Sequence, residues 1–259
     1  MKKHIPNIIT SMNLLCGSCA VILSLWGYLY PAFYFILAAA VFDFLDGFFA
    51  RILNAYSNIG KELDSLADII SFGLAPSVMF FVWYYRIENS LSILAFVPLI
   101  IVVFSALRLA IFNTDTRQTE NFLGLPTPAN AMIIGSLTCY GQICQISKCD
   151  SVVVNLLNSC WFIPVVSIIL ALLLVSNIPM FSIKKKKLNF KENWIISVFL
   201  IGSALIIILG ELFFPHKPIF EGNYSLWILL IFIYYILLNL IRFIITSCRK
   251  VSYPDRQNA

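Results

Sequence analysis

Four aspartates stand out in this sequence because ionised carboxylates are costly in apolar surroundings. Asp43 and Asp46 lie near the end of one strongly apolar run, and Asp64 and Asp68 lie near the start of the next. Residues three or four apart share one face of a helix, so each pair presents both carboxylates on one side. Two such pairs on consecutive antiparallel helices can converge, and clustered carboxylate oxygens are the ligands that hard divalent cations prefer. The sequence therefore predicts a metal site.

Small and basic residues accompany the first pair of acids. Gly47, Ala50 and Arg51 fall with Asp43 and Asp46 within an arc of roughly 140° on one helix face, at about 100° per residue. Small side chains let a ligand approach the backbone closely, and an arginine can bind a phosphate through two N–H donors. This combination favours a site that handles phosphate. A divalent-cation transporter has no evident need of it. A purely structural role is disfavoured because one arginine and one lysine cannot neutralise four acids.

The composition is that of a membrane protein. Of 259 residues, 60% are hydrophobic and only 12% are charged, whereas soluble domains carry about 25% charged residues. Mean hydropathy is +0.87. We predict an all-α integral membrane protein with about eight transmembrane helices, the first of them retained rather than cleaved as a signal peptide. The candidate spans are residues 11–30, 31–51, 64–85, 91–112, 128–147, 152–176, 194–214 and 224–245.

The basic residues predict the orientation in the membrane. With a cytoplasmic amino terminus, only Arg86, Lys148 and Lys217 fall on the outer side, whereas the lysine run at 184–187 and most other basic residues fall inside. This asymmetry favours a multi-pass protein of the cytoplasmic membrane with both termini in the cytoplasm. The net charge of +5 is then explained by topology and contact with anionic lipid rather than by nucleic-acid binding. The four aspartates would lie just inside the membrane on its cytoplasmic side.

Residues 43–68 match a known family signature. The pattern D-x-x-D-G-x-x-A-R-x8-G-x3-D-x3-D fits at every defined position, and the chain is thereby identified as resembling the CDP-alcohol phosphotransferases. The resemblance implies a six-helix core with a polar cavity open to the cytoplasm, usually in a homodimer. It also implies that a substituted phosphate passes from a CDP-linked donor to an alcohol, with release of CMP, and that each active site uses two Mg²⁺ or Mn²⁺ ions.

The resemblance assigns roles to individual residues. Asp43, Asp46 and Asp64 are implied metal ligands, and Asp68 is the implied general base with a metal contact of its own. The implied nucleotide and phosphate contacts are Gly47, Ala50, Arg51 and Gly60, together with Ser57 after the signature arginine and with Asn7 and Thr10 near the start of the chain.

Segments beyond the signature resemble the phosphatidylserine synthase branch of this family. They are residues 63–76, 108–113 and 122–129, and Ser65 stands where phosphatidylglycerophosphate and cardiolipin synthases usually have proline. The expected donor is CDP-diacylglycerol and the expected acceptor is L-serine; glycerol 3-phosphate, inositol phosphate and choline remain as alternatives. The resemblance covers roughly residues 1–180, a catalytic membrane domain. Residues 181–259 contribute a basic cytoplasmic loop and the last two spans outside the shared core.

The acceptor pocket can be sought among basic residues, because serine carries a carboxylate and an ammonium group. Arg108 is the only basic residue of the fourth candidate span. We predict that it binds the serine carboxylate, with Ser71 and Asn113 as polar neighbours. The alternative is that Arg108 extends to a lipid phosphate at the membrane surface.

Overall fold

The structure is a computed structural model that describes residues 4–55, 57–114, 122–146, 152–181, 194–213 and 220–252. Helices form almost all of it, with two short strands. The elements are α1 (Ile5–Leu25), α2 (Leu29–Ile52), α3 (Asn58–Asp68), the π-helical η2 (Ile69–Leu74), α4 (Ala75–Glu88), the 3-10 helix η3 (Ile93–Leu99), α5 (Ile100–Thr114), β1 (Phe122–Leu123), α6 (Thr127–Ile146), α7 (Val152–Leu157), α8 (Phe162–Leu174), β2 (Pro179–Met180), α9 (Trp194–Phe213) and α10 (Phe220–Ser252).

Several of these helices are long and apolar enough to cross a bilayer. Among the described residues they are Ile5–Leu25, Leu29–Ile52, Asn58–Glu88, Ile93–Thr114 and Tyr224–Thr246, with shorter apolar helices at Phe162–Leu174 and Trp194–Gly210. The predicted all-helical, multi-pass membrane protein is thus confirmed in outline. The finer prediction of eight spans around a six-helix core stays a prediction.

The candidate span predicted at residues 152–176 is not one continuous helix. Residues 152–176 form α7 and α8, separated by a turn in which the Ser159 amide donates to the Leu156 carbonyl and the Phe162 amide donates to Ser159. Pro164 lies in the first turn of α8, where its missing N–H leaves no helical bond unmade. The break therefore comes from local turn chemistry within an otherwise apolar stretch.

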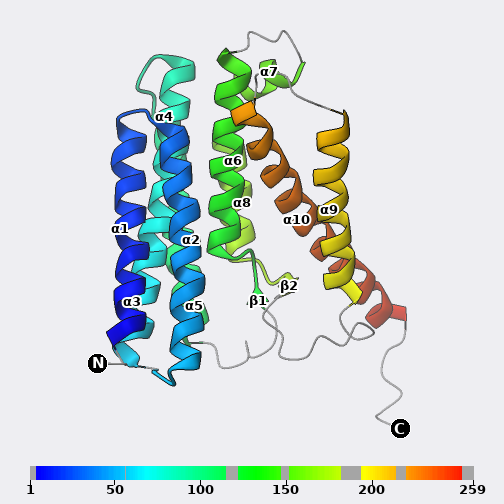
Figure 1. Cartoon of the computed structure of the whole chain (residues 1–259). Coiled ribbons are helices and arrows are strands. Elements are labelled where there is room, and N and C mark those ends of the chain that lie inside the picture. The colour runs from blue at the N-terminus through cyan, green and yellow to red at the C-terminus, as the bar shows by residue number, and fades with distance from the viewer. Residues whose placement is uncertain are drawn as a thin grey trace.

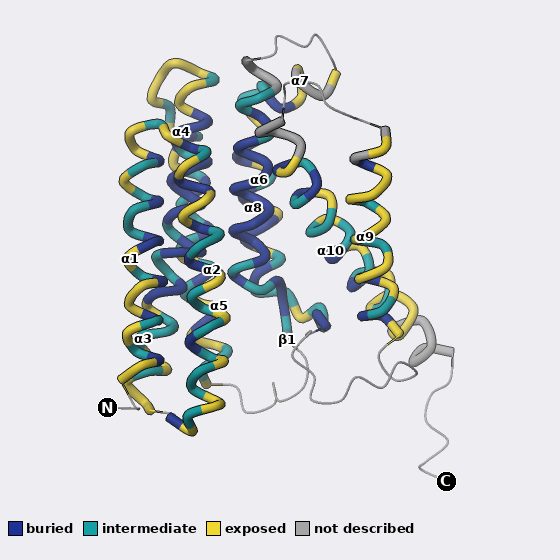
Figure 2. The backbone as a smooth tube through the Cα atoms, viewed as in Figure 1, coloured by how far each residue is buried: buried dark blue, intermediate teal, exposed yellow. Residues whose placement is uncertain are grey.

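The helices form two adjoining groups (Figure 1). Helices α1, α2, α3, α4 and α5 lie together on one side, α6 and α8 lie centrally, and α9 and α10 lie on the other side. The most continuous burial follows α6, whereas α1, α2 and α9 expose apolar outer faces (Figure 2). Outward apolar faces around a buried centre are what a lipid environment requires.

The amino-terminal helices bring the four aspartates toward one end of the bundle. A turn at Gly27, whose φ is +84°, reverses the chain between α1 and α2, so the start of α1 and the end of α2 meet again. Helix α3 begins at that same end, and α10 ends there too (Figure 1). Helix α1 therefore begins, and the described part of α10 ends, on the same side of the molecule.

Helix α10 is joined to the rest by polar as well as apolar contacts. Asn239 and Tyr235 both bind the backbone of Phe181, which follows β2: the Phe181 amide donates to Asn239 Oδ1 (2.9 Å) and the Tyr235 hydroxyl donates to the Phe181 carbonyl (3.1 Å). Because β2 pairs with β1, directly before α6, these two bonds fix α10 beside the start of α6.

Candidate active site

The start of α3 is positioned by a helix cap and a glycine. Ser57 has an extended backbone, and its Oγ accepts a hydrogen bond from the Gly60 amide at 2.9 Å, as N-cap serines commonly do. A Cβ on Gly60 would lie 2.9 Å from Asn7 Oδ1 and 2.9 Å from Ser57 Oγ. Gly60 therefore allows a close approach of α1 to α3, with Asn7 and Ser57 both beside it.

Three of the aspartates form one group. Asp43, Asp64 and Asp68 each contribute a carboxylate oxygen, and these oxygens all lie within 4.8 Å of one another. Asp68 is buried, and Asn13 Nδ2 donates to its Oδ1 at 3.4 Å. Three carboxylates this close repel one another unless protons or cations offset their charge. Their oxygen chemistry and spacing fit a divalent cation.

Asp46 lies outside that group of three. It is 6% exposed, and the Thr10 hydroxyl donates to its Oδ2 at 2.6 Å. The same hydroxyl lies 3.0 Å from the Pro6 carbonyl, so α1 holds the carboxylate of Asp46 in a defined orientation. The structure thus separates a three-carboxylate group from a fourth acid bound to α1, and the metal role of Asp46 stays a prediction.

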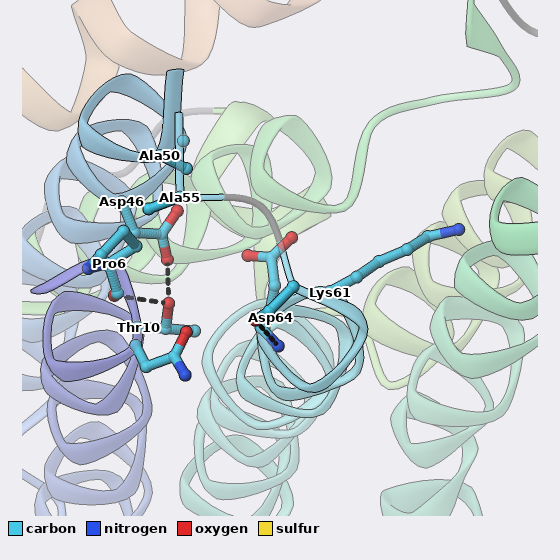
Figure 3. A pocket seen from close by; sticks show the side chains of 11 residues that line it. Pro6, Thr10, Asp46, Ala50, Ala55, Lys61 and Asp64 are labelled. Atoms are coloured by element: carbon cyan, nitrogen blue, oxygen red, sulfur yellow. Dashed lines mark hydrogen bonds between the residues drawn. The ribbon is translucent and has the colours of Figure 1, made fainter. Parts of the chain in front are cut away.

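A cavity of about 210 Å³ lies beside the carboxylates, between α1, the end of α2 and the start of α3. The carboxylates of Asp46 and Asp64 face it, whereas the Lys61 side chain extends away (Figure 3). Every residue predicted to contact nucleotide or phosphate lines this cavity except Arg51. The complete lining is Pro6, Asn7, Thr10, Asp46, Gly47, Ala50, Ala55, Ser57, Gly60, Lys61 and Asp64.

Two basic residues described near this cavity, Arg51 and Lys61, bond to backbone carbonyls. Arg51 is exposed, and its Nε donates to the Gly47 carbonyl of its own helix at 2.9 Å. Lys61, which sequence reasoning missed, lines the cavity, and its Nζ donates to the Asn113 carbonyl at 3.1 Å. A signal for Lys61 was present, because it directly follows the signature glycine in the first turn of α3.

The side-chain hydrogen bonds of the predicted serine-binding residues go to other residues and not to one another. Ser71 lies in η2 and donates to the Asn13 carbonyl of α1 at 3.0 Å. Asn113 Nδ2 donates to Ser65 Oγ of α3 at 2.8 Å. Arg108 faces α6, where its Nη1 lies 3.4 Å from Thr127 Oγ1, and only 8% of Arg108 is exposed. Burial argues against the alternative that Arg108 extends to a lipid phosphate.

Comparison with known proteins decides the family. Residues 3–174 match the CDP-alcohol phosphatidyltransferase family. The chain belongs to this family. The match includes α1 to α8, and with them every residue discussed above as a site residue. Helices α9 and α10 lie beyond the matched region.

Individual relatives in this family agree on one acceptor in their names. The chain is 33% identical to the CDP-diacylglycerol–serine O-phosphatidyltransferase of Helicobacter pylori over 197 residues, which is 75% of this chain and 79% of the relative. It is 34% identical to the Bacillus subtilis protein of the same name, over 57% of this chain and 83% of the relative. It is 35% identical to the archaetidylserine synthase of Methanothermobacter thermautotrophicus, over 55% of this chain and 61% of the relative.

Proposed function

We propose that this CDP-alcohol phosphatidyltransferase transfers the phosphatidyl group of CDP-diacylglycerol to the hydroxyl of L-serine, giving phosphatidylserine and CMP. The observation that carries the proposal is the agreement of its relatives' names on serine. The archaeal relative is named for a different lipid and the same amino acid. The similarity therefore supports serine as the acceptor more directly than it supports a particular lipid in the donor. Family membership supports the reaction class.

The aspartates are the proposed metal ligands. Asp43, Asp64 and Asp68 would hold Mg²⁺ or Mn²⁺ through the oxygens that lie within 4.8 Å of one another, and Asp46 would complete a site for two ions. When bound, such ions would neutralise charge on the donor phosphates and stabilise CMP as it leaves.

The cavity is the proposed site of the donor's cytidine diphosphate. Gly47, Ala50 and Gly60 leave room beside the backbone, and Asn7, Thr10 and Ser57 offer polar atoms. The first turn of α3 adds backbone N–H groups and the positive end of the helix dipole, which favour phosphate. Lys61 and Arg51 supply positive charge at the same end of the bundle.

Asp68 is the proposed general base. It accepts the proton of the serine hydroxyl as the serine oxygen bonds to the phosphorus that carries diacylglycerol, and the bond from that phosphorus to the CMP oxygen breaks. The hydrogen bond from Asn13 orients the Asp68 carboxylate. Serine needs this help because its hydroxyl is a weak nucleophile at neutral pH.

The membrane arrangement is also part of the proposal. We propose a catalytic domain at residues 1–180 with a six-helix core, two additional spans within 181–259, a homodimer, and a cytoplasmic location for both termini and the cavity. The shared end at which α1 begins and α10 ends supports placing both termini on one side (Figure 1). Ser57 should then react with membrane-impermeant cysteine reagents, after substitution by cysteine, only from the cytoplasm. The equivalent test positions Thr119, Lys186 and Lys217 lie outside the described residues.

One assay tests the proposed function. Purified protein is incubated with CDP-diacylglycerol, a divalent cation and a panel of labelled alcohols, and CMP release is measured. We expect release with L-serine and little with glycerol 3-phosphate, inositol phosphate or choline. Preference for another alcohol would retain the reaction class and overturn the acceptor.

A further inference from the structure

Two buried polar side chains of α5 and one of α6 have atoms without hydrogen-bond partners. Within the described part of the chain, Ser105 Oγ, Arg108 Nε and both amide atoms of Asn130 have no partner. Ser105 and Asn130 are fully buried, and Arg108 is nearly so. Buried polar atoms are almost always hydrogen-bonded, and an unmade bond is costly. Several unsatisfied atoms in one region indicate that something polar binds there.

These residues lie on two helix faces that one side-chain contact connects. Ser105 and Arg108 are three residues apart on α5, and Thr127 and Asn130 are three apart on α6, so each pair shares a helix face. The contact between Arg108 Nη1 and Thr127 Oγ1 at 3.4 Å joins the two faces. We call the surroundings of this contact the Arg108–Asn130 region: Ser105 lies one turn before Arg108 on α5, and Asn130 lies one turn after Thr127 on α6.

This region adjoins the proposed base. Gly73 of η2, a few residues after Asp68, packs on Ser105, since a Cβ there would lie 3.3 Å from Ser105 Cβ. Arg108 itself interacts electrostatically with Asp68 and with Tyr235 of α10. A small molecule bound at the Arg108–Asn130 region would thus lie between the carboxylate group and α10.

The charge of the region indicates what it binds. Arg108 of α5 makes no ion pair among the described residues, and its Nη1 lies beside Thr127, the first residue of α6, where the helix dipole is positive. A buried cation that makes no direct ion pair is stabilised by an anion bound beside it. Asn130 adds an amide with one acceptor atom and one donor group, which suits a ligand carrying both a positive and a negative group.

We infer that Asn130 is a recognition residue for the acceptor, which is a zwitterionic amino acid bound in the Arg108–Asn130 region. Arg108 donates to the acceptor carboxylate, and Asn130 Oδ1 accepts a hydrogen bond from its ammonium group. This inference rests on the proposed function. It replaces Ser71 and Asn113, whose side chains are bonded to other elements, as the polar neighbours of Arg108.

The test compares Asn130→Leu with a matched control on the same helix. Leucine keeps the approximate size of asparagine and removes both polar groups. We expect the serine KM to rise at least tenfold while the CDP-diacylglycerol KM stays within twofold of the wild type. The control is Thr138→Val, because Thr138 is equally buried on α6 and its hydroxyl is bonded to the Ile134 carbonyl of its own helix. It should leave both constants unchanged.

Acceptor analogues identify the group that Asn130 binds. 3-Hydroxypropionate lacks the ammonium group of serine, and ethanolamine lacks the carboxylate. The preference of the wild type for serine over 3-hydroxypropionate should shrink about tenfold in Asn130→Leu, whereas the preference over ethanolamine should persist. Should Asn130→Leu fail to fold, Asn130→Ser provides the same comparison with a smaller side chain that remains polar.

The outcomes separate this inference from the proposed function. Serine-dependent CMP release by the wild type, with an unchanged serine KM and unchanged acceptor preference in a folded Asn130 variant, overturns the inference alone. A wild-type protein that releases no CMP with serine overturns the proposed function.

Discussion

The cavity between α1, α2 and α3 and the Arg108–Asn130 region both contain polar side chains, but they differ in access and in hydrogen bonding. The cavity has measurable volume at the end of the bundle, and its lining includes half-buried and exposed residues. The Arg108–Asn130 region is buried between helices and contains unsatisfied polar atoms. A large nucleotide-linked lipid needs an open approach. A small zwitterion is better selected by a closed site, in which each hydrogen bond counts for more than it does in water.

The largest expected effect comes from the carboxylates that lie between the two regions. Asp43→Asn and Asp64→Asn should each lower turnover about 1000-fold, because several kcal/mol of transition-state stabilisation by bound metal would be lost. EDTA should abolish CMP release, and Mg²⁺ or Mn²⁺ should restore it. If Asp46 is also a metal ligand, Asp46→Asn should lower turnover as much as Asp43→Asn does, although Asp46 lies outside the group of three. Full CMP release in the presence of chelator would contradict the metal mechanism.

The next effect concerns Asp68, the group nearest to both substrates in the proposed mechanism. Asp68→Asn keeps the side-chain shape and removes proton acceptance, so kcat should fall by roughly 100- to 10,000-fold. The CDP-diacylglycerol KM should change little by comparison. Initial rates at varied donor and serine concentrations separate these constants. Near-normal turnover would mean that the base lies elsewhere.

A substitution in the Arg108–Asn130 region should affect the acceptor selectively. Arg108→Lys retains the charge and loses the planar two-donor geometry, so the serine KM should rise about tenfold. Donor affinity, measured by direct binding of CDP-diacylglycerol, should remain. A loss of donor binding with an unchanged serine KM would mean that Arg108 acts on the donor and not on the acceptor.

Alanine substitutions at two glycines test whether the donor binds in the cavity. An added Cβ at Gly47 meets nothing within 4 Å, so Gly47→Ala should fold normally and raise the donor KM several-fold by occupying ligand space. Gly60→Ala is the matched comparison, since its Cβ would press on Asn7 and Ser57 and should also lower thermal stability. An unchanged donor KM in a folded Gly47→Ala protein would argue against donor binding in this cavity.

The smallest effect is expected from α10. Tyr235→Phe removes one hydrogen bond to the Phe181 carbonyl, which should cost about 1 kcal/mol of stability. Thermal unfolding in detergent measures this loss. The CDP-diacylglycerol KM should be unaffected, because none of the residues that line the cavity lies on α10. A large rise in the donor KM would show that α10 reaches the donor side of the site.

The sequence by itself determined the helical membrane class, the family signature and the convergence of Asp43, Asp64 and Asp68. Helical spacing and apolar run length are local properties, so they can be inferred from neighbouring residues alone. Spacing also indicated that Gly47 and Ala50 would share a face with the acids, and both line the cavity beside Asp46.

Only the tertiary structure decided which faces meet across long stretches of chain. It placed Lys61 at the cavity, joined Asn113 to Ser65 of α3 and set Arg108 against Thr127 of α6. It also brought α10, outside the family match, beside the start of α6. Periodicity within one helix does not specify its partner. That choice depends on how side chains from distant segments fill the space between helices and satisfy one another's hydrogen bonds.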